Sequence, residues 1–331
     1  YCRKNSKCVI NDIVNELAPK FEAADGLVVG SPVYYASANA TLIALLDRLF
    51  HSTSFSKRMK VGAAVSAARR GGLTATFDEL NKYFNSFLKT ENFPNDISLN
   101  GIQIQNREPN KKQIKKVAFA VDACLETAKQ AKKIGADVLF VHHGIFWGQC
   151  QTLTGSFYST IQEFINNDIA LIAYHIPLDA NNPNGNNYGI AKKIGLTKLK
   201  PFGIWRKMPI GVKGTLKKPM SIEELANLLI STTDKNSSEK NLWQKPQFLE
   251  PQLFNFGKDK IKTVGIISGG AGDDVNQAVE EELDAFITGE FPHESFHFAK
   301  NNKINVIAGG HYQTETFGVN LVMNKLTKDK K

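Results

Sequence analysis

The sequence predicts an α/β protein in which two blocks of alternating strands and helices flank a more polar middle section. Short apolar runs typical of buried strands alternate with amphipathic stretches of helical period. Several of these runs end directly in glycine, histidine or acidic residues. A separate strand–helix–strand pattern precedes the two blocks. With 331 residues, the chain is long enough for about two domains of roughly 100–200 residues each.

The first 77 residues predict a parallel strand–helix–strand unit. Apolar residues at helical spacing predict a helix over 10–23, and glycines bound a short apolar strand over 26–30. Apolar positions at 42–50 mark a second helix, and a second strand is predicted over 60–67. Strands that alternate with helices in this way favour parallel βαβ architecture.

The stretch AADGLVVGSPVYYASANATLIALLDRLF closely resembles the flavodoxin-like group of NAD(P)H-dependent FMN reductases and iron–sulfur flavoproteins. The resemblance implies that the loop over 30–35 would lie against a flavin, and the segment 69–72 fits the same pattern. Cys2 and Cys8 look like the end of the cysteine cluster in the iron–sulfur members. The phosphate loop and the outer strands of that fold have no counterpart in this sequence. We therefore expect an incomplete flavodoxin-like fragment that does not bind FMN.

The two parts of the chain meet abruptly, with the flavodoxin-like fragment over 1–78 and the larger domain over 79–331. No linker rich in glycine, proline or serine separates them. Two explanations are open: a gene fusion, or an artefact that joined unrelated reading frames. Amplification across the junction from the source DNA would distinguish them, because only a fusion yields one contiguous frame.

In the larger domain, strands and helices alternate on both sides of a polar section over 190–260. The predicted helices lie at 81–88, 123–134 and 313–325. The predicted strands lie at 116–121, 137–141, 169–174, 263–268, 284–288 and 305–308. Within the polar section, we expect loops at 217–219 and 234–240.

Histidines and carboxylates gather at the ends of three of the predicted strands, where four of the seven histidines of the chain lie. In open α/β sheets, ligands bind beyond the carboxyl ends of the strands. We therefore expect these side chains to border one site. In chain order they are His142, His143, His175, Asp179, His311 and Glu315.

Imidazoles and carboxylates without cysteine suit Zn, Fe, Mn or Co. A turn at Gly144 would let His142 and His143 border one cavity, on different metals. His311 and Glu315 stand four residues apart at a predicted helix start, so they share one face. Taken singly, each of these residues also fits a hydrogen-bonded strand end or a solvated pair. Taken together they exceed the three ligands of a catalytic zinc, whereas two metals sharing a carboxylate would use them all.

Six motifs in the larger domain resemble the Nif-three-like dinuclear metal-centre family, whose members are commonly labelled GTP cyclohydrolase I type 2 homologues. The resemblance covers about residues 79–331, with the motifs in the family's order. It implies a fold of two β-α blocks around a central metal site, with a middle insertion. The motifs are NGIQIQN, VAFAVDACLETA, ADVLFVHHGIFWG, AYHIPLDA, ITGEFPHE and AGGHYQTETFGV.

The resemblance implies a centre of two divalent transition-metal ions (Zn, Fe or Mn). It assigns Asp179 as the bridging ligand, and His175 as a catalytic residue that faces the substrate or supports a ligand. The metal ligands that it implies are His142, His143, Asp179, His311 and Glu315.

Five more residues lie near these positions in the sequence. Asp122, Glu290 and His293 match other motif positions of the family and would line the pocket. The alternative for these three is a hydrogen-bonded strand end. Phe146 and Trp147 follow the histidine pair, and we expect both to be core residues rather than a stacking platform.

Three functions are open. The first is a metal-dependent hydrolase of the GTP cyclohydrolase I type 2 kind, in which a metal-activated water attacks the purine C8 of GTP. No GxxxxGK[ST] loop is present, so a nucleotide would be held by other means. The second is a non-catalytic metal-binding or partner-binding protein. The third is a flavin-dependent NAD(P)H oxidoreductase that acts through the N-terminal fragment.

Composition excludes several classes of partner. The formal charge is +9, from 41 basic and 32 acidic residues, without the clustered basic stripe that nucleic-acid binding needs. No apolar run reaches the length of a membrane span, so we expect no membrane. Four scattered cysteines fit a reducing cytoplasm. We expect a small-molecule substrate, with nucleotides among the candidates, and the family resemblance implies a homo-oligomer.

Overall fold

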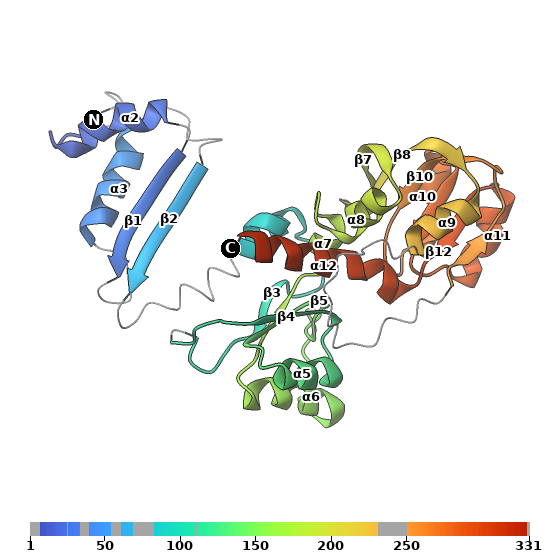
Figure 1. Ribbon diagram of the computed structural model, residues 1–331, viewed down its shortest axis with the longest axis horizontal. Coiled ribbons are helices and arrows are strands. Elements are labelled where there is room, and N and C mark those ends of the chain that lie inside the picture. The colour runs from blue at the N-terminus through green and yellow to red at the C-terminus, as the bar shows by residue number, and fades with distance from the viewer. Residues whose placement is uncertain are drawn as a thin grey trace. The chain divides into compact units, whose positions relative to one another are not determined.

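The computed structural model of the chain describes residues 7–24, 26–33, 40–53, 61–68, 83–109, 111–230 and 250–329. The chain divides into two compact units, one of residues 1–79 with 108–113 and the other of residues 80–107 with 114–331. Most elements of both units are labelled in Figure 1. Within the described ranges, no helix combines the length and apolar character needed to cross a membrane.

The first unit confirms the predicted strand–helix–strand pattern. Its elements are α2 (Ile13–Ala23), β1 (Gly26–Val33), α3 (Ala40–Ser52) and β2 (Val61–Ala68). The two strands pair in parallel, and Asp12 caps α2 by accepting a hydrogen bond from the backbone of Val14. Buried residues of α2 and α3 form a small core with Cys8.

Several expectations for the N-terminal fragment fall on residues outside the described ranges. These are Cys2, part of the expected flavin loop, the segment 69–72 and the junction at 78–79. Cys8 is described: its Sγ accepts hydrogen bonds from the guanidinium of Arg48, which also pairs with Asp12 at 2.6 Å.

Two repeats of one strand–helix order build the second unit. In each repeat the last three strands are parallel, and the first strand pairs antiparallel with the last. The two predicted β-α blocks are therefore confirmed. The first repeat is β3 (Gly101–Ile104), β4 (Val117–Asp122), α5 (Leu125–Lys133), β5 (Val138–His143), α6 (Gly155–Asn166) and β6 (Ala170–Ala173). The second is β9 (Gln252–Phe254), β10 (Ile261–Ile266), α10 (Val275–Glu280), β11 (Ala285–Thr288), α11 (His293–Asn301) and β12 (Asn305–Ala308).

Between the repeats lies an insertion that begins ahead of the predicted polar section over 190–260, and the structure describes it as far as Ile230. It contains α7 (Ile176–Ala180), α8 (Asn186–Lys193), β7 (Leu196–Trp205), β8 (Met208–Met220) and α9 (Ile222–Ile230). The hairpin of β7 and β8 extends the second sheet, whose strand order is β7-β8-β10-β11-β12-β9, whereas the first sheet has the order β3-β6-β5-β4.

The predicted loop at 217–219 is wrong, because these residues belong to the last part of β8. This strand buries Met208, Ile210 and Val212 along its length, and its lysines project outward at the end of the sheet. Consecutive lysines interrupt the alternation of apolar and polar residues, so the sequence did not indicate a strand here. The second predicted loop, at 234–240, lies outside the described residues.

Helices cover both faces of the second sheet. Successive side chains of a strand point to opposite faces, and β11 shows the result. Ala285 and Ile287 pack in the core formed with α8 and α9, whereas Phe286 packs in the core formed with α10 and α11. Both faces of this strand are therefore buried, which explains its continuous apolar sequence.

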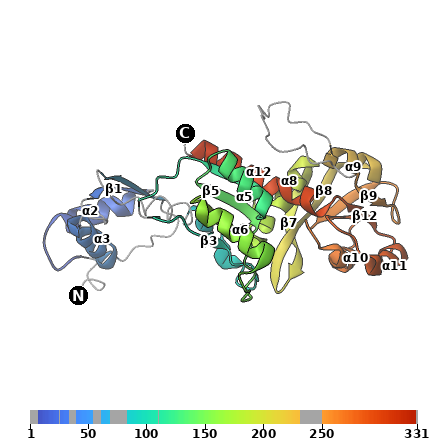
Figure 2. The ribbon, with the colours of Figure 1, turned by 90° about the horizontal axis from the view of Figure 1, so that it is seen from below.

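The first sheet is covered by α5 and α6 on one face, as Figure 2 shows over β5. On the other face Phe140 packs against Phe84 and Tyr174, with ring centroids 4.7 and 5.8 Å away. Phe84 belongs to the helical residues 83–88, which confirms the helix predicted over 81–88.

One long helix, α12 (His311–Asp329), joins the two repeats. It packs against β4 and β5 of the first repeat and against α8 of the insertion, and it follows directly on β12 of the second repeat (Figure 1). Its last turn is held by a hydrogen bond from the hydroxyl of Tyr83 to Asp329 at 2.6 Å. Its first turn lies at the end of β12, where the predicted site residues begin.

Candidate metal centre

β5 delivers two histidines whose ring centroids lie 4.4 Å apart. His142 is fully buried, and its Nδ1 lies 3.0 Å from the backbone oxygen of Tyr174. The Nδ1 of His143 lies 2.8 Å from Oδ1 of Asp122, which stands opposite it on β4. In both rings an acceptor occupies Nδ1, so Nε2 is the nitrogen left for a ligand.

β6 leads into His175 and Asp179. Ile176–Ala180 form the short helix α7, with a proline in its first turn where a missing N–H costs nothing. The Nδ1 of His175 lies 2.9 Å from Asp96. Asp179 accepts hydrogen bonds on Oδ1 from Asn186 and Ser268, both at 2.8 Å, so its Oδ2 is the oxygen that faces His142.

β12 leads into His311 and Glu315, which confirms the predicted pair at the start of a helix. The Nδ1 of His311 lies 2.8 Å from Glu290, and its Nε2 lies 3.1 Å from Oε1 of Glu315. The side chain of Glu315 is buried, with 4% exposed. Its Oε1 also faces His142 at 3.4 Å, and its Oε2 faces His143 at 3.3 Å.

All six predicted side chains converge at one place. Their ligand atoms form three overlapping groups, and within each group the atoms lie no more than 4.8 Å apart. The groups are His142–His143–His175, His143–His311–Glu315 and His142–Asp179–Glu315. Nε2 of His142 and Oε2 of Glu315 are buried without a hydrogen-bond partner. Buried polar atoms are rarely left unpaired, so these two orphan atoms mark a place for a ligand.

Charge interactions within the cluster are strong. Burial alone would lower the pKa of His142, but the facing carboxylates of Asp179 and Glu315 raise it to about 10. The hydrogen bond to Glu315 outweighs burial and raises the pKa of His311 to about 9. Burial would raise the pKa of Glu315, yet the positive charge of His142 and the hydrogen bond from His311 hold it well below its ordinary value. The centre therefore attracts positive charge, either as protons or as a metal ion.

The residues of the cluster could hold a metal ion. The donors are imidazole nitrogens and carboxylate oxygens without thiolates, as Zn, Fe and Mn accept. Each of the four histidines has its Nδ1 fixed by an oxygen acceptor. Such supporting acceptors are usual behind metal-bound histidines, because they fix the tautomer and the ring orientation.

Two positions that pack against the start of α12 require glycine. Gly269 follows β10 with a positive φ of 71°, and a Cβ there would collide with Oε1 of Glu315. Gly289 follows β11, and a Cβ there would come within 2.8 Å of the Cα of His311. The glycines that end these strands therefore make room for the functional side chains of α12.

The secondary candidates divide. Asp122 and Glu290 reach the centre indirectly, as the partners of His143 and His311. His293 takes no part in the described cluster and instead faces His297 on α11, with ring centroids 6.3 Å apart.

The two aromatic residues after the histidine pair also divide. Phe146 packs against the core of the first sheet, as expected. Trp147 lies against the histidines instead, with ring centroids 5.0 Å from His175 and 5.9 Å from His143. The adjacent positions point in different directions, and sequence reasoning had treated them as equivalent.

Three supporting residues were missed from the sequence: Asp96, Asn186 and Ser268. The side chain of Asp96 is almost fully buried and contacts the Nδ1 of His175. Burial would raise the pKa of Asp96, but the hydrogen bond with His175 opposes burial and the pKa is lowered. Its one local signal is the hydrogen bond that it accepts from the backbone of Ser98, a turn common to aspartate.

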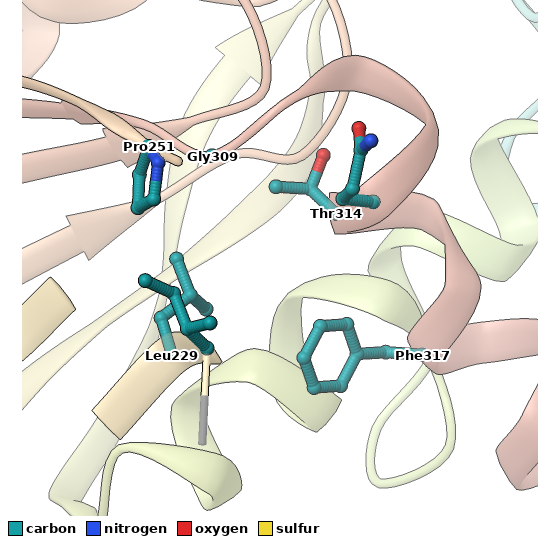
Figure 3. A pocket seen from close by; sticks show the side chains of 7 residues that line it. Leu229, Pro251, Gly309, Thr314 and Phe317 are labelled. Atoms are coloured by element: carbon teal, nitrogen blue, oxygen red, sulfur yellow. The ribbon is translucent and has the colours of Figure 1, made fainter. Parts of the chain in front are cut away.

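A small apolar pocket lies beside α12, and none of the residues of the candidate metal centre line it (Figure 3). It contains no histidine or carboxylate, so it does not explain the orphan atoms. Its lining residues are Leu229, Ile230, Pro251, Gly309, Gln313, Thr314 and Phe317.

Comparison with known proteins gives two matches to family models. The family described as Duf34/NIF3 (NGG1p interacting factor 3) matches residues 75–331. The model of the NADPH-dependent FMN reductases matches residues 1–99. Residues 75–99, which precede the first repeat, fall within both matches.

Curated relatives and solved structures agree with the first match. A GTP cyclohydrolase 1 type 2 homolog of Treponema pallidum is 41% identical in an alignment of 274 positions that covers 77% of this chain and 95% of that protein. Its namesake in Deinococcus radiodurans is 38% identical over 73% of this chain and 85% of its own. The crystal structure of TTHA1606 from Thermus thermophilus is 31% identical, with a TM-score of 0.64 over 76% of this chain and 93% of that one.

Proposed function

The chain belongs to the Duf34/NIF3 family, and from this premise we propose that it is a metal-dependent hydrolase with a dinuclear metal centre. We place this centre in a domain over 79–331, preceded by a flavodoxin-like fragment over 1–78. The observation that carries the proposal is the convergence of ligand atoms from both repeats around two buried orphan atoms, Nε2 of His142 and Oε2 of Glu315.

Two of the three groups supply the two metal positions. His142, Asp179 and Glu315 would hold one ion, and His143, His311 and Glu315 the other. Glu315 would be the bridge in place of Asp179, because both of its oxygens face histidines, whereas Asp179 has one oxygen committed to Asn186 and Ser268.

When bound, two such ions lower the pKa of a water molecule and polarise a carbonyl or phosphoryl oxygen. His175 would act beside them as a general acid or base. Its Nδ1 lies 2.9 Å from the carboxylate of Asp96, so its Nε2 is the nitrogen that a proton transfer at the centre would use. The side chain is 19% exposed, so a substrate and the solvent both have access to it.

The substrate in this proposal is a small molecule, and the name of the curated relatives points to GTP. Hydrolysis would open the purine ring at C8. This extension to GTP is supported by the relatives' name and by a centre suited to water activation.

The first test is the metal content of the purified chain. Elemental analysis should find about two transition-metal ions per chain, with at least half lost in His142→Ala. Because His142 is fully buried, circular dichroism must confirm folding, and His143→Ala provides a second, partly exposed variant. His297→Ala on α11 is the matched control and should keep the wild-type content.

Incubation of the metal-loaded protein with GTP tests the hydrolase itself. Release of a ring-opened product should depend on the metal and fall in His175→Ala. A chain that holds two metals yet leaves GTP and related substrates unchanged would contradict the hydrolase, whereas a chain that holds no metal after reconstitution would contradict the centre.

A further inference from the structure

Trp147 is the aromatic residue that lies against the histidines of the centre from outside the ligand set. Its ring is nearly perpendicular to that of His175, at 80° and 5.0 Å between centroids. It is partly exposed, and it is not part of the cores formed with α5 and α6, with α8 and α9, or with α10 and α11. An indole in this position offers an accessible apolar surface directly beside the place where a substrate must sit.

The backbone around Trp147 is fixed from both sides. Phe146 accepts a hydrogen bond from the backbone N–H of Leu99 at 3.1 Å. Gly148 has a positive φ of 73°, and a Cβ there would come within 2.9 Å of the backbone oxygen of Ile97. The segment that carries Trp147 is therefore held against the loop that contains Asp96, the partner of His175. Such a surface is formed before a ligand arrives, which reduces the entropy lost on binding.

The charge around the centre is acidic. Five carboxylates surround the centre: two of them are candidate ligands, and the other three contact the Nδ1 atoms of the histidines. Among the described residues, none of these five carboxylates forms an ion pair with a lysine or arginine. The negative charges of these five carboxylates would exceed the positive charges of two divalent ions by one. The five are Asp96, Asp122, Asp179, Glu290 and Glu315.

The exposed edge of the centre has the same character. Asp122 and Glu290 have 49% and 62% of their side chains exposed, and Tyr312 is 44% exposed. Arginine and lysine side chains are common partners of phosphate groups in proteins. The described side chains at this edge are acidic and aromatic instead, so a polyphosphate would meet repulsion from them and an uncharged ring would not.

We propose that the site takes an uncharged planar heteroaromatic ring that stacks on Trp147, and that a phosphate chain contributes nothing to recognition. This inference rests on the dinuclear centre proposed above. It specifies the substrate class for that centre: a nucleoside or free base binds at least as well as the corresponding triphosphate.

Equilibrium dialysis of the zinc-loaded full chain tests the inference, with guanosine, GTP and inorganic triphosphate as probes. Guanosine should bind as tightly as GTP or more tightly, and triphosphate should not displace it. In Trp147→Ala the affinity for guanosine should fall by about 5- to 150-fold, the range measured for the loss of base–aromatic stacking. Trp147→Phe should stay within about threefold of wild type, because a flat ring remains.

Trp205→Phe is the matched control, since Trp205 lies on β7 and contacts the guanidinium of Arg206. It should bind guanosine as the wild type does. In the wild type, guanosine should also quench a part of the tryptophan emission that is missing from Trp147→Phe.

Zinc is measured in every sample after dialysis, because GTP and triphosphate themselves bind metal ions. Tight binding of triphosphate, or unchanged binding of guanosine in Trp147→Ala, would overturn the inference. So would a zinc-loaded wild type that does not bind guanosine. A wild type that retains no zinc would refute the metal centre itself, so the two failures are distinguishable.

Discussion

The two repeats of the second unit share their framework and differ at the ends of their strands. In each, an aspartate directly before the middle parallel strand accepts two backbone hydrogen bonds, from the two residues before β4 in the first repeat and from β10 in the second. Asp137 accepts two bonds at 2.8 and 3.0 Å, and Asp284 accepts two bonds at 2.9 Å. The last strand of each repeat then leads into a histidine followed four residues later by a carboxylate: His175 and Asp179, or His311 and Glu315.

The difference lies in what each repeat adds to that common pattern. The middle strand of the first repeat ends in His142 and His143, whereas that of the second leads into Gly289 and Glu290. The first repeat therefore supplies three histidines, and the second supplies the carboxylate that all the described groups but one share. The strand–helix framework of each repeat therefore brings the strand ends to one place, and the residues at those ends determine the chemistry.

The two equivalent carboxylates should not be equally important. Glu315→Gln should remove both metals, because it takes away the oxygens common to both positions and places an amide N–H toward a histidine. Asp179→Asn should remove about one, because only one oxygen of Asp179 faces the cluster. Elemental analysis of the folded variants measures this.

Glu294→Gln, at an exposed position of α11, is the control for the loss of a carboxylate and should retain both metals. Equal metal loss in Glu315→Gln and Asp179→Asn would show that the repeats contribute symmetrically, against our assignment of the bridge.

The cores of the two repeats should be equally important. Phe140 and Phe286 are fully buried in the middle strands of the two sheets. Replacing either with alanine should lower the free energy of unfolding by about 3–5 kcal/mol. Because α12 packs against the first repeat and continues the second, both variants should shift one urea-unfolding transition of the second unit.

Phe298→Ala, at a 40% exposed position of α11, is the control and should change stability by no more than about 0.5 kcal/mol. Two separate transitions, each moved by one variant alone, would show that the repeats unfold independently.

The carboxylates behind the histidines offer a finer comparison. Asp122→Asn and Glu290→Gln should each weaken metal binding by about 10- to 100-fold, the usual effect of losing such a partner. The loss should be larger for Asp122, because His143 is 19% exposed and His311 is 39% exposed, so water replaces Glu290 more readily.

Competition with a chelator of known affinity measures these losses, with Glu294→Gln again as the control. A larger loss in Glu290→Gln than in Asp122→Asn would show that burial of the histidine does not set the strength of its support.

The smallest effect concerns the framework aspartate of the second repeat. Burial would raise the pKa of Asp284, but hydrogen bonds from Lys258 and from the backbone of Thr263 lower it. An aspartate whose pKa is lowered by folding contributes stability above its unfolded pKa of about 3.9, and this is lost as the pH falls through the folded value.

Asp284→Asn should therefore cost about 0.5–1.5 kcal/mol at pH 7, the typical net value of a hydrogen bond, since the amide keeps one acceptor. Urea titrations from pH 7 to 3 should show the difference from wild type shrinking toward the acidic end. A difference that is constant with pH would contradict a role for the charge of Asp284.

The site was predictable from the sequence where the signal is local. His311 and Glu315 are four residues apart, so a helix start alone places them together, and His142 and His143 follow an evident strand. The supporting residues had no such signal. Asp96 is 79 residues from His175, and Ser268 is 89 residues from Asp179, so only the folded chain reveals the contacts.

The fold was predictable to the same extent. The apolar strands that end at the site were predicted to within two residues at each end, because their sequences are almost continuously apolar and most of them are buried on both faces. The hairpin of β7 and β8 was missed, because its strands are rich in lysine and its turn is unusual. Arg206 and Lys207 occupy the turn with φ of 48° and 69°, where glycine or asparagine would have given the usual signal.

The place of Glu315 on α12 also sets an order of events during synthesis. A nascent chain that has been translated through β12 already contains His142, His143, His175 and Asp179, yet it lacks Glu315, which two of the three ligand groups share. In the proposed dinuclear centre, both positions would therefore be completed only by translation of α12. Until then the early histidines are free imidazoles, open to whichever transition metal the cell leaves unbound, and the ions that bind tightest to nitrogen have the first opportunity.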